Sequence, residues 1–277
     1  MSEIKIRSVE QFIKQINSIE KKTDAELFFR GHASKSWILE PAIFRSKEDL
    51  LKNEKNLVSD LITQCPEEFK DCQYTFEYLV KMQHYGLPTR LLDITSNALV
   101  ALYFACGSSN KKEDNPRGQI LIYQIMRNVI KNYSSDTVSV LSNLVYLDED
   151  CNLYNEDERG RFIYFIKREK GYFIDRINCD ADLSKVICVR AKLNNPRIIR
   201  QSGLFFLFGM GRTKKDPIKI SEEDGIKQIT TPHLVILPKY KQKIINELRY
   251  LGISEETLMP EIDIVAKSIK NRYSRKE

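Results

Sequence analysis

The chain has 277 residues, of which 42% are hydrophobic and 30% charged, and its formal net charge is +6. These values are typical of a globular protein with one large domain or two small ones. No run of about 18 apolar residues occurs, which argues against a transmembrane helix and a membrane partner. Since the first five residues also lack an apolar secretory segment, we expect a cytoplasmic protein.

The six cysteines include no C-x-x-C pair, and only three histidines occur. This composition predicts no metal site. Cys106 and Cys188 lie in apolar runs and are expected to be buried. The positive charge is compatible with a polyanionic partner such as a nucleic acid, but a lysine-rich surface in contact with solvent has the same composition, so both interpretations stay open.

Hydrophobic periodicity defines the elements of the first third of the chain. Ser8, with Gln11 three positions later, is typical of a helix start, and Gly31 ends an aromatic strand. The elements predicted here are a helix over 8–19, a strand over 26–32, a short strand and turn over 36–45, and helices over 48–65 and 67–82.

The most informative stretch runs from His84 to Ala105, and it has a polar half and an apolar half. In the polar half, Gly86 permits unusual dihedral angles and Pro88 restricts them. The apolar half predicts a buried helix over residues 98–105, with Ser96 or Asn97 as its N-cap. Such a helix fixes the preceding polar loop and directs a partial positive charge at it, which favours a binding site.

The remaining elements alternate between strands and helices without a repeat or a flexible linker. We therefore predict one α+β domain over residues 1–277, with a mixed or antiparallel sheet flanked by helices. The predicted elements are a loop over 107–117, strands over 118–125, 163–166, 184–190, 203–209 and 234–237, and helices over 136–145, 239–251 and 261–270.

Three arginine and aspartate positions are candidates for chemistry. Arg30 stands near the end of an aromatic strand and is followed by glycine, an arrangement that presents a guanidinium to a phosphate or carboxylate while the glycine lets the ligand approach. Pairing of Arg30 with an internal acid is the alternative. Arg90 and Asp93 either belong to the site or form a buried ion pair that closes the loop.

Three segments together resemble the FRG domain family, which is named after its Phe/Tyr-Arg-Gly triplet. They are Phe28–Gly31, then Gln83–Asp93 with Ala101–Ala105, then Gln201–Phe205, and the resemblance extends over about residues 8–270. Two packing positions differ, because Ile94 stands where the family usually has Trp and Ala98 where it often has Pro. Genes of this family often lie among phage-related, defence or toxin–antitoxin loci.

The order of these motifs is similar to that of ADP-ribosyltransferases. There an aromatic-Arg-Gly triplet binds the NAD phosphates, a Ser/Thr motif follows, and a third motif supplies a glutamate near the nicotinamide ribose. Here the order is Arg30, then residues 89–95, then Gln201, which stands in place of the glutamate. A neutral Gln stabilises the oxocarbenium-like ribose poorly, so Asp93 or an acid within 148–158 is a candidate replacement.

The resemblance implies an NAD-dependent ADP-ribosyltransferase, with NAD as substrate, that acts as an intracellular toxin or anti-phage effector. Its target would be RNA or DNA, which the positive charge favours, or a protein, and a cognate antitoxin would be its partner. The catalytic candidates are His84, Arg90, Asp93, Thr95 and Gln201. The NAD-binding candidates are Phe29, Arg30, Gly31, His32, Tyr85 and Thr89.

Two other functions stay open. In a metal-independent nuclease, His32 and His84 would act as acid and base beside Arg30, Arg90 and Asp93, and nucleic acid would break without NAD. In a non-catalytic module that binds a nucleotide or a phage component, ligand would bind without turnover.

Overall fold

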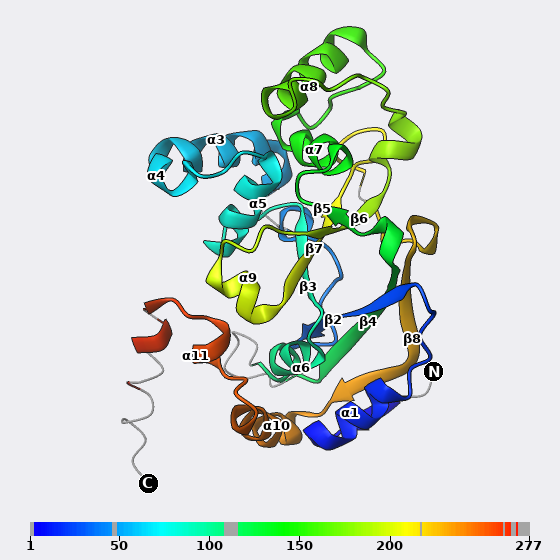
Figure 1. Cartoon of the computed structure of the whole chain (residues 1–277), viewed down its shortest axis with the longest axis vertical. Coiled ribbons are helices and arrows are strands. Elements are labelled where there is room, and N and C mark those ends of the chain that lie inside the picture. The colour runs from blue at the N-terminus through cyan, green and yellow to red at the C-terminus, as the bar shows by residue number, and fades with distance from the viewer. Residues whose placement is uncertain are drawn as a thin grey trace.

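One eight-stranded sheet organises the chain, in the order β1-β8-β4-β2-β3-β7-β6-β5. Figure 1 shows the computed structural model, with α7 and α8 at one end and α1 and α10 at the other. The structure describes residues 3–45, 49–107, 116–216, 218–262, 264–266 and 270. The strands are β1 (Glu3–Ile6), β2 (Ala25–His32), β3 (Leu91–Thr95), β4 (Gly118–Met126), β5 (Lys131–Asn132), β6 (Val186–Arg190), β7 (Gly203–Phe208) and β8 (Ile226–Ile236).

The helices are α1 (Val9–Asn17), α2 (Ala42–Arg45), α3 (Glu54–Gln64), α4 (Pro66–Phe69), α5 (Thr75–His84), α6 (Ala98–Cys106), α7 (Asp136–Asn143), α8 (Glu156–Glu169), α9 (Pro196–Gln201), α10 (Pro238–Tyr250) and α11 (Glu255–Leu258). The longer helices α1, α5, α6, α7, α8 and α10 pack on one face of the sheet, and the other face is covered by Leu39, Phe44, Val129, Ile130, Ile218 and Ile220. The pairs β1–β8 and β5–β6 are parallel and the other pairs antiparallel, which confirms the predicted mixed sheet flanked by helices. No helix among the described residues is long and apolar enough to cross a bilayer.

The sheet is weakly joined at its centre. Strand β2 pairs with β4 along its whole length, from Ala25 to His32, but it pairs with β3 only through Phe29 and Thr95. Beyond that pair the two strands separate, which leaves space between a β1-β8-β4-β2 half and a β3-β7-β6-β5 half. A gap in the backbone ladder exposes polar groups, and such positions favour ligand binding.

Separate apolar clusters support the two halves of the sheet. One gathers Phe12, Leu102 and Ile244 from α1, α6 and α10 over the first half. Another gathers side chains of α5, α7 and α8, among them Leu141 and Phe162, with Leu207 of the second half. Cys106 and Cys188 are buried, as predicted.

Several local predictions are wrong. Residues 163–166 lie in α8, which begins at the Asn155 cap and buries Phe162 and Ile166 at helical spacing. The strand prediction failed because a run of four apolar residues does not distinguish a helix from a strand. Residues 36–45 contain α2 and no strand. The helix predicted over 67–82 is interrupted between α4 and α5. Most of the predicted loop over 107–117 and much of the predicted helix over 261–270 lie outside the described residues.

Candidate functional site

A cleft of about 360 Å³ lies where β2 and β3 separate, and its walls come from β2, β3, β7, α5, α6 and α9. Most of the predicted site residues line it, although they come from distant parts of the chain. Those that line the cleft are Phe29, Arg30, Gly31, His84, Asp93, Thr95 and Gln201. His32, Tyr85, Thr89 and Arg90 do not.

Arg30 is held in one orientation from two sides. Its Nε donates to His32 Nε2 at 3.0 Å, and its Nη1 donates to the Asp93 carbonyl oxygen at 2.5 Å. The Asp93 carboxylate is 3.9 Å from Nη1, while Nη2 donates no hydrogen bond to a described residue. Because the side chain is 17% exposed and faces the cleft, its remaining donors are available to an anion.

His32 supports Arg30 from behind. Its side chain is buried, and burial together with the positive charge of Arg30 lowers its pKa to about 4. The imidazole is therefore neutral near pH 7 and can accept the hydrogen bond from Arg30. His32 therefore positions Arg30 and does not itself line the cleft.

The Asp93 carboxylate is oriented by a chain of side chains that the sequence analysis did not predict. Gln83 Nε2 donates to Asp93 Oδ2 at 2.8 Å, and Thr89 Oγ1 donates to Gln83 Oε1 at 2.5 Å. Gln83 is thus a missed site residue. The signal that could have indicated it is its place at the start of Gln83–Asp93, one of the segments that resemble the FRG family.

Thr95 connects three elements at the floor of the cleft. Its Oγ1 donates to the Gln201 carbonyl oxygen at 2.6 Å and accepts from the Asn97 backbone N–H at 3.0 Å. The Gln201 side chain donates to the Leu258 carbonyl oxygen at 3.1 Å. Its amide therefore holds α9 against the end of α11. Asn97, and not Ser96, caps α6.

His84 and its neighbour Tyr85 face different surroundings. His84 Nε2 lies 3.3 Å from Glu261 Oε1, and burial, followed by the charge of Arg197, lowers the pKa of His84. Tyr85 instead donates its hydroxyl to Glu68 at 2.9 Å and lines a second cleft. Tyr85 therefore lines the second cleft and not the first, and its contact with NAD stays a prediction.

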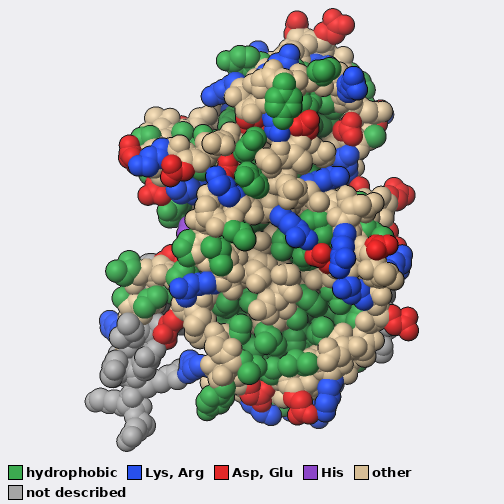
Figure 2. Space-filling model, in the orientation of Figure 1, with side chains coloured by type: hydrophobic (Ala, Val, Ile, Leu, Met, Phe, Trp, Pro, Cys, Tyr) green, Lys and Arg blue, Asp and Glu red, His purple; other side chains and the backbone are tan. Residues whose placement is uncertain are grey.

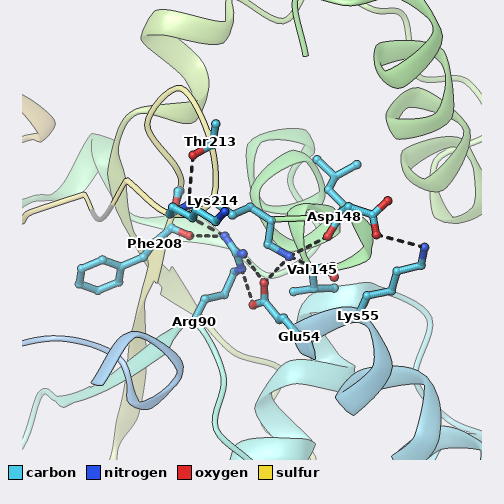
Figure 3. Close-up of polar contacts among 11 residues, drawn as sticks. Glu54, Lys55, Arg90, Val145, Asp148, Phe208, Thr213 and Lys214 are labelled. Atoms are coloured by element: carbon cyan, nitrogen blue, oxygen red, sulfur yellow. Dashed lines mark hydrogen bonds and ion pairs between the residues drawn. The ribbon is translucent and has the colours of Figure 1, made fainter. Parts of the chain in front are cut away.

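Arg90 lies outside the cleft, in the fully buried cluster shown in Figure 3. Its Nε and Nη2 donate to the two carboxylate oxygens of Glu54 at 2.9 and 2.6 Å, and Lys214 Nζ reaches the same carboxylate at 2.7 Å. The alternative that Arg90 pairs with Asp93 is therefore wrong. Since none of these groups reaches the cleft, Arg90 stabilises the fold instead of contacting a substrate.

Gly31 is required by packing. A Cβ at this position would lie 1.9 Å from the Ala101 carbonyl oxygen and 2.7 Å from the Ala105 nitrogen. The glycine of the triplet thus lets α6 approach β2. Gly31 also lines the cleft, so its role in ligand access stays a prediction.

Residues 25–114 match the family model of the FRG domain. The chain carries an FRG domain. No curated protein and no solved structure matches it. The matched residues supply Arg30, Gln83, His84 and Asp93 to the cleft, and the later part of the chain completes it with Gln201 and other residues of α9 and β7.

The surface of the chain carries charges of both signs. On the face shown in Figure 2, Lys and Arg are interspersed with Asp and Glu, and apolar side chains gather in the region of α6. Among the described residues no group of three His, Cys, Asp or Glu side chains is placed to hold a metal ion.

Proposed function

We propose that the FRG domain binds NAD in this cleft and transfers its ADP-ribosyl group to an acceptor. The orientation of Arg30 supports the proposal. A guanidinium held through Nε and one Nη1 proton, with its other donors directed at a cleft, is suited to a diphosphate, because it binds phosphate oxygens in pairs. Phe29, Trp37 and Phe104 provide aromatic faces in the same cleft for a nicotinamide or adenine ring.

Asp93 is the best candidate for the anion that stabilises the reacting ribose. When the bond between ribose and nicotinamide breaks, positive charge develops on the ribose, and a fixed carboxylate nearby lowers the energy of that state. Asp93 lines the cleft and is oriented by Gln83, whereas the Gln201 amide is engaged with Leu258. We therefore assign the electrostatic role to Asp93 and a positioning role to Gln201.

Among the alternatives, a nucleotide-binding module would use Arg30 in the same way without turnover. The nuclease has less support. His32 Nε2 already accepts a hydrogen bond from Arg30, and of the two histidines only His84 lines the cleft. We also infer a cytoplasmic setting, where NAD is available and the six free cysteines stay reduced. The effector role and the antitoxin partner stay predictions.

Trp37 makes the proposal directly testable, because it is the only tryptophan in the chain and it lines the cleft. Fluorescence of the purified chain is titrated with NAD, and released nicotinamide and label transferred to cell lysate are measured in parallel. Arg30→Ala should weaken NAD binding by about tenfold or more, since hydrogen bonds to charged groups contribute about 1.5–3 kcal/mol. Arg127→Ala, at an exposed arginine outside the cleft, is the matched control.

Each outcome of this experiment separates the functions. Binding, nicotinamide release and transfer that all depend on Arg30 would support the transferase. Binding without release would support the nucleotide-binding module. Breakage of RNA or DNA without NAD would support the nuclease, and an unchanged Trp37 signal with NAD would contradict the proposal.

A further inference from the structure

A second cleft of about 590 Å³ adjoins the first. The side chains of Val80, His84 and Arg197 line both clefts, so the two spaces meet at these residues. The second cleft continues between α5, the connection from β6 to α9, and residues 260–261.

We infer that this second cleft receives the acceptor of the transfer, and that Glu261 takes the proton which the acceptor loses. The inference rests on the proposed function, because it requires NAD in the first cleft. It assigns a catalytic carboxylate to a residue outside the matched FRG segment, and a substrate site to a cleft between α5, which belongs to that segment, and later parts of the chain.

The surroundings of Glu261 carry the inference. Its Oε1 lies 3.3 Å from His84 Nε2 and 3.9 Å from Arg197 Nη1, at the place where the clefts meet. Both of its carboxylate oxygens are shielded from solvent, yet neither accepts a hydrogen bond from the described residues. Buried carboxylates with a purely structural role normally accept such bonds. An unsatisfied carboxylate beside a substrate cleft is instead available to a proton.

The segment that carries Glu261 is attached to the wall of the first cleft. Arg200 Nη1 donates to the Thr257 carbonyl oxygen at 3.3 Å, and Gln201 Nε2 donates to the Leu258 carbonyl oxygen at 3.1 Å. Gln201 stands where an acid is expected from the order of the motifs. Through its hydrogen bond to Leu258, Gln201 helps to hold the segment that places the carboxylate of Glu261 where the two clefts meet.

The charges of the second cleft favour a protein side chain as acceptor. Lys81 lies 3.1 Å from Glu68, and Lys192 lies 3.5 Å from Glu77, so both lysines already have a carboxylate partner. The third cation of the lining, Arg197, lies 3.9 Å from Glu261. The rest of the lining combines apolar side chains and the exposed ring of Tyr85 with the polar side chains of Asp71, His84, Asn194 and Asn195. A phosphodiester chain needs cations without such partners, whereas a side chain with a nucleophilic O, N or S atom does not.

The chemical step balances without another reagent. The bond between C1′ of the ribose and the nicotinamide nitrogen breaks, and its electron pair leaves with neutral nicotinamide. The acceptor atom forms a bond to C1′, and its proton moves to the Glu261 carboxylate. The net products are nicotinamide, the ADP-ribosylated acceptor and one proton.

Two pairs of variants of the full chain test the inference. Glu261→Gln removes the proton acceptor, with Glu255→Gln on the exposed start of α11 as its control. Asn194→Trp fills the second cleft, with the neighbouring Leu193→Trp, which is exposed outside the cleft, as its control. Binding of NAD is measured by isothermal titration calorimetry, because the two tryptophan variants add a second fluorophore beside Trp37. Transfer is measured by labelled NAD with lysate protein or purified RNA.

We expect Glu261→Gln and Asn194→Trp to reduce transfer to protein by about a hundredfold, the effect of losing general base catalysis or acceptor access. Their affinity for NAD should stay within twofold of the wild type. Transfer at the wild-type level in either variant would overturn the inference while leaving the proposed function intact. Loss of NAD binding in Asn194→Trp, or transfer to RNA alone, would also overturn it. Absence of NAD binding in the wild type would overturn both.

Discussion

Arg90 and Glu54 form a bidentate ion pair in the interior of the protein, with the two side chains 0% and 2% exposed. Lys214 joins the same carboxylate and also donates to the Leu147 carbonyl oxygen at 2.9 Å. Burial alone would raise the pKa of Glu54, but Arg90 and Lys214 outweigh it and lower the pKa to about 2. The cluster therefore stays charged and ties α3, the start of β3 and the segment after β7 together.

Glu54→Gln should destabilise the protein strongly, because it leaves two buried cations without their counterion. Breaking such a pair costs about 3–5 kcal/mol of unfolding free energy. The change is measured by urea denaturation. Glu10→Gln, which breaks the exposed pair between Glu10 and Lys14, is the control and should leave the midpoint unchanged. Equal stability of the two variants would contradict a structural role for the cluster.

The stability of the protein should fall as the pH is lowered from about 6.5 to about 4. His32 has a pKa of about 4 in the folded chain, against 6.5 for an unperturbed histidine, so the unfolded state binds more protons in this range. The shift corresponds to about 3 kcal/mol. Unfolding free energies at pH 7 and pH 4.5 measure it. His32→Gln keeps an acceptor for Arg30 and should reduce this pH dependence; an equal slope in the variant would refute the assignment.

Gly31→Ala and Gly160→Ala should have opposite effects on stability. At Gly31 the new methyl group would collide with the backbone of α6, and overpacking costs about 1–3 kcal/mol. Gly160 lies in the interior of α8 with nothing within 4 Å of its would-be Cβ, so alanine there should stabilise by up to about 1 kcal/mol. Thermal unfolding compares them. A neutral Gly31→Ala would mean that α6 can move away from β2 at little cost.

Asp93→Asn should separate NAD binding from NAD cleavage. The substitution removes the negative charge but can keep the contact with Gln83, so affinity measured through Trp37 should change by less than about threefold while nicotinamide release falls about a hundredfold. Asp60→Asn, on α3 away from the cleft, serves as the control. Release at the wild-type rate in Asp93→Asn would show that another group stabilises the ribose.

Local signals in the sequence predicted much of the fold. Ser8 accepts from the Gln11 backbone N–H and starts α1 as expected, and the apolar run after Asn97 forms a buried helix. These features depend on contacts within a few residues, which a sequence displays directly. The strand predicted at 163–166 failed because its short apolar run belongs to a longer capped helix.

The sequence by itself determined the central polar segment, the Arg30 strand and the buried helix that follows, because spacing and backbone chemistry decide those. Only the tertiary structure decided the partners. Arg90 pairs with Glu54, 36 positions away, instead of with its neighbour Asp93, and Gly31 serves packing against α6. Glu261 reaches His84 only because α9 and α11 meet in space. Charge pairs and close packing depend on three-dimensional distance, and residue spacing along the chain carries no direct record of it.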